Sequence, residues 1–228
     1  MIRAVIFLMC LPHMADAACR QALALGLDVS GSVDTVEYRQ QLDGVAAALQ
    51  SEAVQDVLFM HPGAPITVAI YEWSGPEDQS VILPWTALSD PAALHAAVAQ
   101  LQAHQRQPAA PTTAIGSAML AGFVLLDQQP TCWKRTLDLS GDGRANTGPR
   151  PQDIAPHFLP PGVVVNGLVI DGTTDAELTT YYKSYVVRGP GAFVETATGF
   201  ADYAQAMERK LLRELESMVM GAADIPAH

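Results

Sequence analysis

The stretch QALALGLDVSGS, residues 21–32, decides the fold and raises the question of function. It opens with a continuous apolar run, typical of a strand buried on both faces of a parallel sheet. Asp28, Ser30 and Ser32 then follow at alternate positions. Three oxygen-bearing side chains with no imidazole or thiol among them suit a hard cation such as Mg²⁺. Asp and Ser also cap helices and close turns, so this motif by itself leaves both readings open.

Strand-like and helix-like segments alternate along the rest of the chain. Over residues 34–49 apolar side chains recur at helical spacing, and either Ser32 or Asp34 can cap that helix. Residues 74–78, with Gly75-Pro76, predict a hairpin turn. Periodicity and turn residues predict further helices at 89–104, 114–126, 153–158 and 201–220, and strands at 21–28, 66–73, 79–83, 135–139, 163–170 and 192–197.

This alternation predicts an α/β fold: a doubly wound, mostly parallel central sheet with helices on both faces and one antiparallel edge strand. No linker or change of composition divides the 228 residues, so we expect one domain over 18–220 and a flexible tail at 221–228. In such sheets, ligands bind beyond the carboxyl ends of the strands, where the strand order reverses.

The first residues resemble a secretory signal peptide over 1–17. Arg3 supplies the positive end, residues 4–11 the apolar core, and Ala15-Asp16-Ala17 a small-x-small cleavage site. An ordinary buried first strand is the alternative reading. The signal peptide predicts a secreted or periplasmic protein, and no apolar stretch reaches the roughly 18 residues of a membrane span.

The formal net charge is −11. Without a basic patch to displace counterions, binding to nucleic acid or to an anionic membrane is disfavoured. An acidic surface suits cations or partners with basic surface, although it also serves solubility alone.

Removal of the signal peptide leaves Cys19 and Cys132, and an even pair in an exported protein predicts a disulfide, with two free buried thiols as the alternative.

Two more oxygen-rich segments are expected at the same edge of the sheet as the first motif. Pro111-Thr112-Thr113 opens the helix at 114–126, and Ser140-Gly141-Asp142-Gly143 follows the strand at 135–139. Together the three segments provide two carboxylates and several hydroxyls. Three such segments in this order favour a cation site much more strongly than the first motif does alone.

With these residues the chain resembles the von Willebrand factor A (VWA) domain, from about Leu23 to Met220. Its D-x-S-x-S motif matches Asp28, Ser30 and Ser32, its threonine matches Thr113 in TAIGSAM (113–119), and its late aspartate matches Asp142. The chain also resembles an uncharacterised group of secreted bacterial single-VWA proteins, in which we expect a GDG turn like that at residues 141–143 and a late GPGAF like that at residues 189–193. The resemblance implies a divalent cation, Mg²⁺ first and Mn²⁺ or Ca²⁺ as alternatives, at a metal-ion-dependent adhesion site (MIDAS).

The chain departs from the family pattern at two positions. Thr112 stands where the family has Gly, which makes Thr112 an alternative ligand to Thr113. Gly141 stands before Asp142, where the family commonly has Thr. The resemblance also implies that the strands at 21–28 and 135–139 are parallel neighbours, which brings Cys19 and Cys132 together at the opposite edge from the metal, where they can form a disulfide.

The function implied is a secreted, cation-dependent protein-binding module, not an enzyme, whose metal accepts the acidic side chain of a protein partner. The first alternative is a Mg²⁺-dependent phosphatase of the haloacid dehalogenase type with Asp28 as nucleophile. That family needs acids where this chain has Ser30 and Asn146. The second alternative is a VWA domain whose cation is purely structural.

Overall fold

The computed structural model describes residues 19–171 and 176–222, with side chains up to Leu215. The predicted signal peptide at 1–17 lies outside the described residues. So does the tail predicted from 221, apart from residues 221 and 222, which belong to the last helix.

A six-stranded sheet in the order β3-β2-β1-β4-β5-β6 forms the centre of the molecule. All neighbouring strands are parallel except β2 and β3, so β3 is an antiparallel edge strand. This confirms the predicted fold class and places β1 and β4 side by side at the middle of the sheet. The strands are β1 (Gln21–Asp28), β2 (Ile66–Trp73), β3 (Gln79–Leu88), β4 (Lys134–Gly141), β5 (Val163–Ile170) and β6 (Val194–Ala197).

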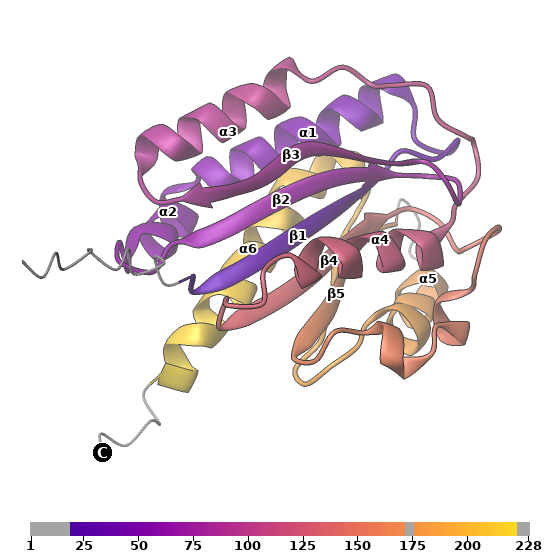
Figure 1. Ribbon diagram of the computed structural model, residues 1–228. Coiled ribbons are helices and arrows are strands. Elements are labelled where there is room, and N and C mark those ends of the chain that lie inside the picture. The colour runs from indigo at the N-terminus through magenta and orange to yellow at the C-terminus, as the bar shows by residue number, and fades with distance from the viewer. Residues whose placement is uncertain (1–18, 172–175, 223–228) are drawn as a thin grey trace, which may run out of the picture.

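Helices cover both faces of the sheet (Figure 1). The α-helices are α1 (Thr35–Gln50), α2 (Glu52–Phe59), α3 (Pro91–Ala103), α4 (Ile115–Asp127), α5 (Ala176–Tyr181) and α6 (Tyr203–Ala222). One hydrophobic cluster joins the sheet to α1, α2, α3 and α6, and a second joins the other face to α4 and α5. Within the described ranges, no helix combines the length and the apolar character that a membrane span needs.

Strand β1 is buried along its whole length, and its side chains alternate between the two clusters. Leu25 and Leu27 pack on the α1 side, whereas Ala22 and Ala24 pack on the α4 side. The same alternation places Asp28 on the α4 side at the carboxyl end of the strand. Burying a large aliphatic side chain contributes roughly 1.5–3 kcal/mol, so these core positions hold the strand end in place.

The start of helix α1 settles which residue caps it. Asp34 is the N-cap: its Oδ1 accepts hydrogen bonds from the backbone N–H of Val36 and Glu37, at 2.7 and 2.9 Å. Glu37 Oε2 in turn accepts from the backbone N–H of Asp34 at 2.8 Å, which completes a capping box. Ser32 is therefore not the cap of α1, and its hydroxyl is free to form other hydrogen bonds.

Three local predictions were wrong or incomplete. Residues 153–158 do not form one helix: two 3₁₀ turns, Pro151–Asp153 and Pro156–Phe158, stand there, because Pro156 disfavours helical backbone at the preceding residue. Strand β3 continues to Leu88, beyond the predicted end at residue 83. Helices α2 and α5, and the π-helical turn Tyr182–Val186 after α5, were not predicted.

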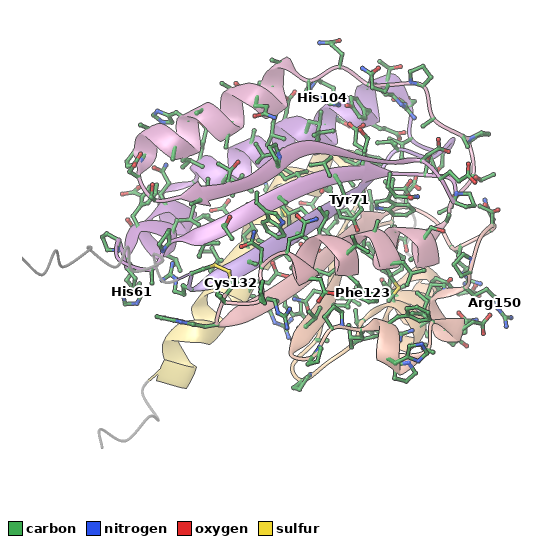
Figure 2. All side chains as sticks on the ribbon, viewed as in Figure 1. His61, Tyr71, His104, Phe123, Cys132 and Arg150 are labelled. Atoms are coloured by element: carbon green, nitrogen blue, oxygen red, sulfur yellow. A yellow bond between two sulfur atoms is a disulfide. The ribbon has the colours of Figure 1, made fainter. Side chains whose placement is uncertain are left out.

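A disulfide joins Cys19 and Cys132, just before β1 and β4, with 4.5 Å between the two Cα atoms. This is the pairing that the family resemblance implied. Figure 2 places Cys132 at the opposite end of the sheet from Arg150, which lies in the long segment that follows β4. The cross-link therefore fixes the amino ends of the two central strands and leaves their carboxyl ends to the candidate site.

Candidate metal centre

Three segments meet at the carboxyl end of β1 and β4. The first runs from Asp28 to Ser32, the second contains Thr113 just before α4, and the third begins at Asp142 directly after β4. The Ser32 hydroxyl donates to Asp142 Oδ1 at 2.7 Å, and the hydroxyl oxygens of Ser30 and Ser32 are 3.3 Å apart. The structure thus brings the predicted residues of the first and third segments together.

Backbone contacts join all three segments. The N–H of Gly31 donates to the carbonyl of Pro111 at 3.1 Å, linking the first segment to the second. Thr113 and Asn146 link the second to the third, because the Thr113 N–H donates to Asn146 Oδ1 at 2.9 Å and the Asn146 N–H donates to the Thr113 carbonyl at 3.0 Å. The site is therefore a braced unit and not three independent loops.

The second segment distinguishes between its two threonines. Thr113 is buried, and its Oγ1 lies 4.0 Å from the position that a Cβ on Gly143 would occupy. Thr112 Oγ1 lies instead 3.2 Å from the equivalent position on Gly75, in the hairpin after β2. The Thr113 side chain thus lies near the segment that carries Asp142, whereas the Thr112 hydroxyl lies near the hairpin after β2. This geometry favours Thr113 over Thr112 as the residue of the site.

Burial is graded across the candidate residues. Asp28 and Ser30 are 0% and 1% exposed and Thr113 is 6% exposed. Asp142 is half-buried and Ser32 is exposed. The site therefore has a closed floor made by the first residues of the motif and a rim that opens to solvent at Ser32 and Asp142.

The carboxylate of Asp28 is only partly satisfied. Its Oδ1 accepts from the Ser30 N–H at 2.8 Å, whereas Oδ2 has no hydrogen-bond partner among the described residues. Burial, reinforced by the nearby charge of Asp142, raises the pKa of Asp28 to about 7. No basic side chain in the described part of the chain forms an ion pair with either aspartate. Two carboxylates that share a site without a positive partner are electrostatically unfavourable, and a bound cation would relieve this.

The donor set fits a hard divalent cation. Two aspartates and three hydroxyl residues offer oxygen atoms only, which is the ligand type of Mg²⁺, Mn²⁺ and Ca²⁺. Across the residues that the structure describes, no group of three or more His, Cys, Asp and Glu side chains is arranged to hold a metal. The candidate site therefore depends on its serine and threonine hydroxyls as much as on its carboxylates.

Asp138, two residues before Ser140 on β4, faces the other side of the sheet. Its Oδ2 lies 2.8 Å from Lys210 Nζ, and Lys210 Nζ lies 2.6 Å from Glu214 Oε1, all three side chains being buried beneath α6. Asn166 donates to the same Glu214 oxygen at 2.6 Å. This aspartate is part of the anchor of α6 and lies outside the candidate site.

Two residues that the sequence did not single out hold the first segment. Arg106, in the loop after α3, donates to the carbonyls of Val29, Ser30 and Val33 at 2.8, 3.3 and 2.7 Å. Gln41 of α1 donates from Nε2 to the carbonyl of Asp28 at 2.8 Å. No sequence motif marks an arginine in a loop or a glutamine on a helix as a partner of distant backbone carbonyls, so these two contacts could be found only in the folded structure.

A hollow of about 520 Å³ adjoins the open side of the site. Asp142 and Gly143 form the edge that it shares with the candidate site, and Glu37, Arg144 and Phe200 line it further out. Arg144 is paired with Glu177 at 2.7 Å across this surface. The surface beside Asp142 is therefore polar and of mixed charge.

Solved structures of low sequence identity share the fold. Proximal thread matrix protein 1 (PTMP1) from the mussel byssus has a TM-score of 0.64 at 16% identity, over 88% of this chain and 49% of that one. A von Willebrand factor type A protein from Catenulispora acidiphila has a TM-score of 0.57 at 15% identity, and the match covers 87% of this chain and 43% of that one. The PilB minor pilin from Streptococcus sanguinis has a TM-score of 0.64 at 12% identity, and the match covers 94% of this chain and 65% of that one. Another PTMP1 structure is described as having a zinc-occupied MIDAS motif.

The chain spans about half the length of PTMP1, so the likeness concerns only part of that protein. It shows that this chain has a VWA-like fold. No protein with a curated description matches the chain in sequence. One family model does match, over residues 18–219, and the chain belongs to that family, described as protein of unknown function (DUF1194).

Proposed function

We propose that this protein is a divalent-cation-dependent protein-binding module. Asp28, Ser30, Ser32, Thr113 and Asp142 hold the cation, directly or through water, and Mg²⁺ is the expected ion. When bound, the cation supplies a Lewis-acidic position that takes a carboxylate oxygen from a protein partner. The observation that carries the proposal is that the Ser32 hydroxyl contacts Asp142 Oδ1 at 2.7 Å at the same end of the sheet as Asp28, whose buried Oδ2 has no partner among the described residues.

Coordination chemistry supports an acidic partner. Two aspartates do not saturate the oxygen coordination of a divalent ion, which takes six or more ligands and keeps exchangeable water. The residues nearest solvent, Ser32 and Asp142, leave one side of the site open. A partner's Asp or Glu can replace a bound water there, which gives a directional and charge-assisted contact.

The VWA-like fold and the comparison proteins support the same role. PTMP1 is a matrix protein of the byssus and PilB a minor pilin, and a PTMP1 structure is described with zinc in its MIDAS motif. By extension we propose that this chain acts outside the cytoplasm, as the signal-like residues 1–17 predict. The phosphatase alternative is less favoured, because Ser30 stands in place of the second acid and Asn146 is engaged with the Thr113 backbone.

Calorimetry with and without the site carboxylates tests the proposal. We expect the purified chain to bind about one equivalent of Mg²⁺ or Mn²⁺, and Asp142→Asn to weaken that binding by at least tenfold. Asp153→Asn is the matched control, because Asp153 is an exposed aspartate of the same long segment and pairs with Arg150. Equal affinity in Asp142→Asn and wild type, or no binding in wild type, contradicts the cation site.

Recognition of a carboxylate is tested separately. Partners are captured on the immobilised chain with Mg²⁺, with chelator, and with Asp142→Asn in Mg²⁺. We expect capture to need both the cation and Asp142, and we expect glutamate-rich peptides to compete for it. Capture that survives chelation indicates a cation with a purely structural role, and turnover of a generic phosphate ester favours the phosphatase.

A further inference from the structure

Tyr182 approaches the candidate site from the α5 side of the sheet. It is the first residue of the π-helical turn that ends at Val186, and it is fully buried. A Cβ added at Gly167 of β5 would lie 2.8 Å from Tyr182 Cδ1, so the ring lies directly against the sheet at that glycine. π-Helical turns often occur at functional sites, and this one directs a tyrosine toward the end of β4.

The hydroxyl of Tyr182 reaches the space beside Gly141. A Cβ added at Gly141 would collide with this hydroxyl and would lie 3.0 Å from Asp28 Oδ2. The hydroxyl and the carboxylate oxygen thus both border one small space, which exists only because residue 141 has no side chain. Gly141 is also the position at which the chain departs from the Thr-Asp-Gly pattern of VWA domains.

Two buried polar atoms at this space, the Tyr182 hydroxyl and Asp28 Oδ2, have no hydrogen-bond partner among the described residues, and neither has Nε1 of Trp73, whose ring carbon Cζ2 borders the space. The Trp73 ring comes within 3.4 Å of the same Cβ position on Gly141. A buried polar group without a partner costs about 1–3 kcal/mol, so these groups need an explanation. The chemistry is complementary, because tyrosine and indole donate while a carboxylate oxygen accepts.

The Tyr182 hydroxyl, like any phenolic hydroxyl, can donate a hydrogen bond to a carboxylate oxygen. Burial, and then the charges of Asp28 and Asp142, raise the pKa of Tyr182 well above its ordinary value. A donor behind a metal-binding carboxylate fixes its orientation, and such partners affect metal affinity strongly.

We propose that Tyr182 is a positioning residue of the metal site: its hydroxyl donates to Asp28 Oδ2, directly or through one bridging water, and fixes the carboxylate for the cation. This inference rests on the proposed cation site and adds to it a residue outside all three motif segments. Gly141 is then the complement of Tyr182, because it leaves room for the hydroxyl beside Asp28.

The first test removes only the hydroxyl. Tyr182→Phe keeps the ring against Gly167, and we expect it to weaken Mg²⁺ binding in calorimetry by roughly tenfold. Tyr203→Phe is the matched control, because Tyr203 is equally buried and its hydroxyl pairs with Ser140 Oγ at 2.9 Å. We expect that control to keep the Mg²⁺ affinity of wild type within twofold.

The second test moves the hydroxyl to residue 141. In the Tyr182→Phe background we expect Gly141→Ser to recover most of the lost Mg²⁺ affinity, and Gly141→Ala, which adds the Cβ alone, to recover none. A purely structural role for Tyr182 predicts no such difference between serine and alanine.

The outcomes separate the two proposals. If wild type binds Mg²⁺ and Tyr182→Phe binds it equally well, the role of Tyr182 is refuted and the cation site stands. If wild type binds no cation, both proposals fail. If the double variants do not fold, the comparison of Tyr182→Phe with Tyr203→Phe still decides the matter.

Discussion

Ser32 and Asp142 are 110 positions apart in the chain, yet the Ser32 hydroxyl donates to Asp142 Oδ1 at 2.7 Å. The contact follows from the strand order, because β1 and β4 are parallel neighbours and the segments after them leave the sheet at the same edge. The capping box at Asp34 and Glu37 leaves the Ser32 hydroxyl available for this contact. Helix capping and site formation are therefore divided between different residues of one segment.

Cation binding should depend on pH through Asp28. Burial raises the pKa of Asp28 to about 7 from an ordinary value near 3.8. At a pH between these two values, Asp28 is therefore protonated in the folded chain and ionised in the unfolded chain. Without a cation, the free energy of unfolding then falls as the pH rises between these two values. A cation binds the ionised form, so we expect Mg²⁺ to raise Tm more at pH 8 than at pH 5. Equal Tm shifts at both pH values, in thermal melts with and without Mg²⁺, contradict this account.

Arg106 should control the first segment. Its guanidinium donates to three carbonyls there, and each hydrogen bond to a charged group contributes roughly 1.5–3 kcal/mol. We expect Arg106→Met to lower both the free energy of unfolding and the Mg²⁺ affinity, the latter by about tenfold. Arg39→Met is the control, since Arg39 donates to carbonyls at the end of α3. An Arg106→Met protein with unchanged Mg²⁺ affinity shows that the segment holds its shape unaided.

The buried charges of Asp138, Lys210 and Glu214, between α6 and the sheet, should contribute to the free energy of unfolding and not to metal binding. Lys210→Met leaves the carboxylates of Asp138 and Glu214 buried without their cation, so we expect a loss of about 3–5 kcal/mol in the free energy of unfolding. Arg209→Met removes an exposed pair with Glu195, which contributes at most about 1 kcal/mol. Denaturant unfolding measures both. A loss for Lys210→Met no larger than that for Arg209→Met contradicts a role for this cluster in anchoring α6.

The disulfide should stabilise the fold without affecting the site. It joins residues 113 positions apart, and closing a loop of this size contributes about 4–5 kcal/mol in the chain-entropy model. We expect the double variant Cys19→Ser and Cys132→Ser to unfold at lower temperature and to bind Mg²⁺ as wild type does at 20 °C. The disulfide precedes β1 and β4, while the site follows their other ends. Loss of Mg²⁺ affinity in a variant that is still folded contradicts this separation.

Much of the fold could be predicted from local patterns. The apolar run before Asp28 and the helical spacing after Asp34 correspond to β1 and α1 as the structure has them. Helix α2 was missed because it is only eight residues long and follows α1 after a single residue, Ser51, which ends one helix and caps the next. Helix α5 was missed because AELTTY lacks an apolar stripe and contains β-branched and aromatic residues.

The residues of the candidate site and their common edge of the sheet could be predicted from the sequence and the family resemblance, but the residues that hold them in place could not. Alternating oxygen side chains after a buried strand mark Asp28, Ser30 and Ser32, but no local signal marks the residues that brace them. Tyr182 carries no motif, because its relation to Asp28 depends on glycines in two other strands that let its ring lie against the sheet. The choice between Thr112 and Thr113 likewise depends on which neighbouring segment each side chain meets.

One cation is expected to occupy the point where the three segments meet. Crystals of the chain grown with Mn²⁺ and measured at the manganese absorption edge test it directly. We predict a single strong anomalous peak among Asp28, Ser30, Ser32, Thr113 and Asp142, about 2.0–2.3 Å from at least one serine hydroxyl oxygen. The absence of such a peak, or a peak elsewhere on the acidic surface with these side chains unliganded, contradicts the account.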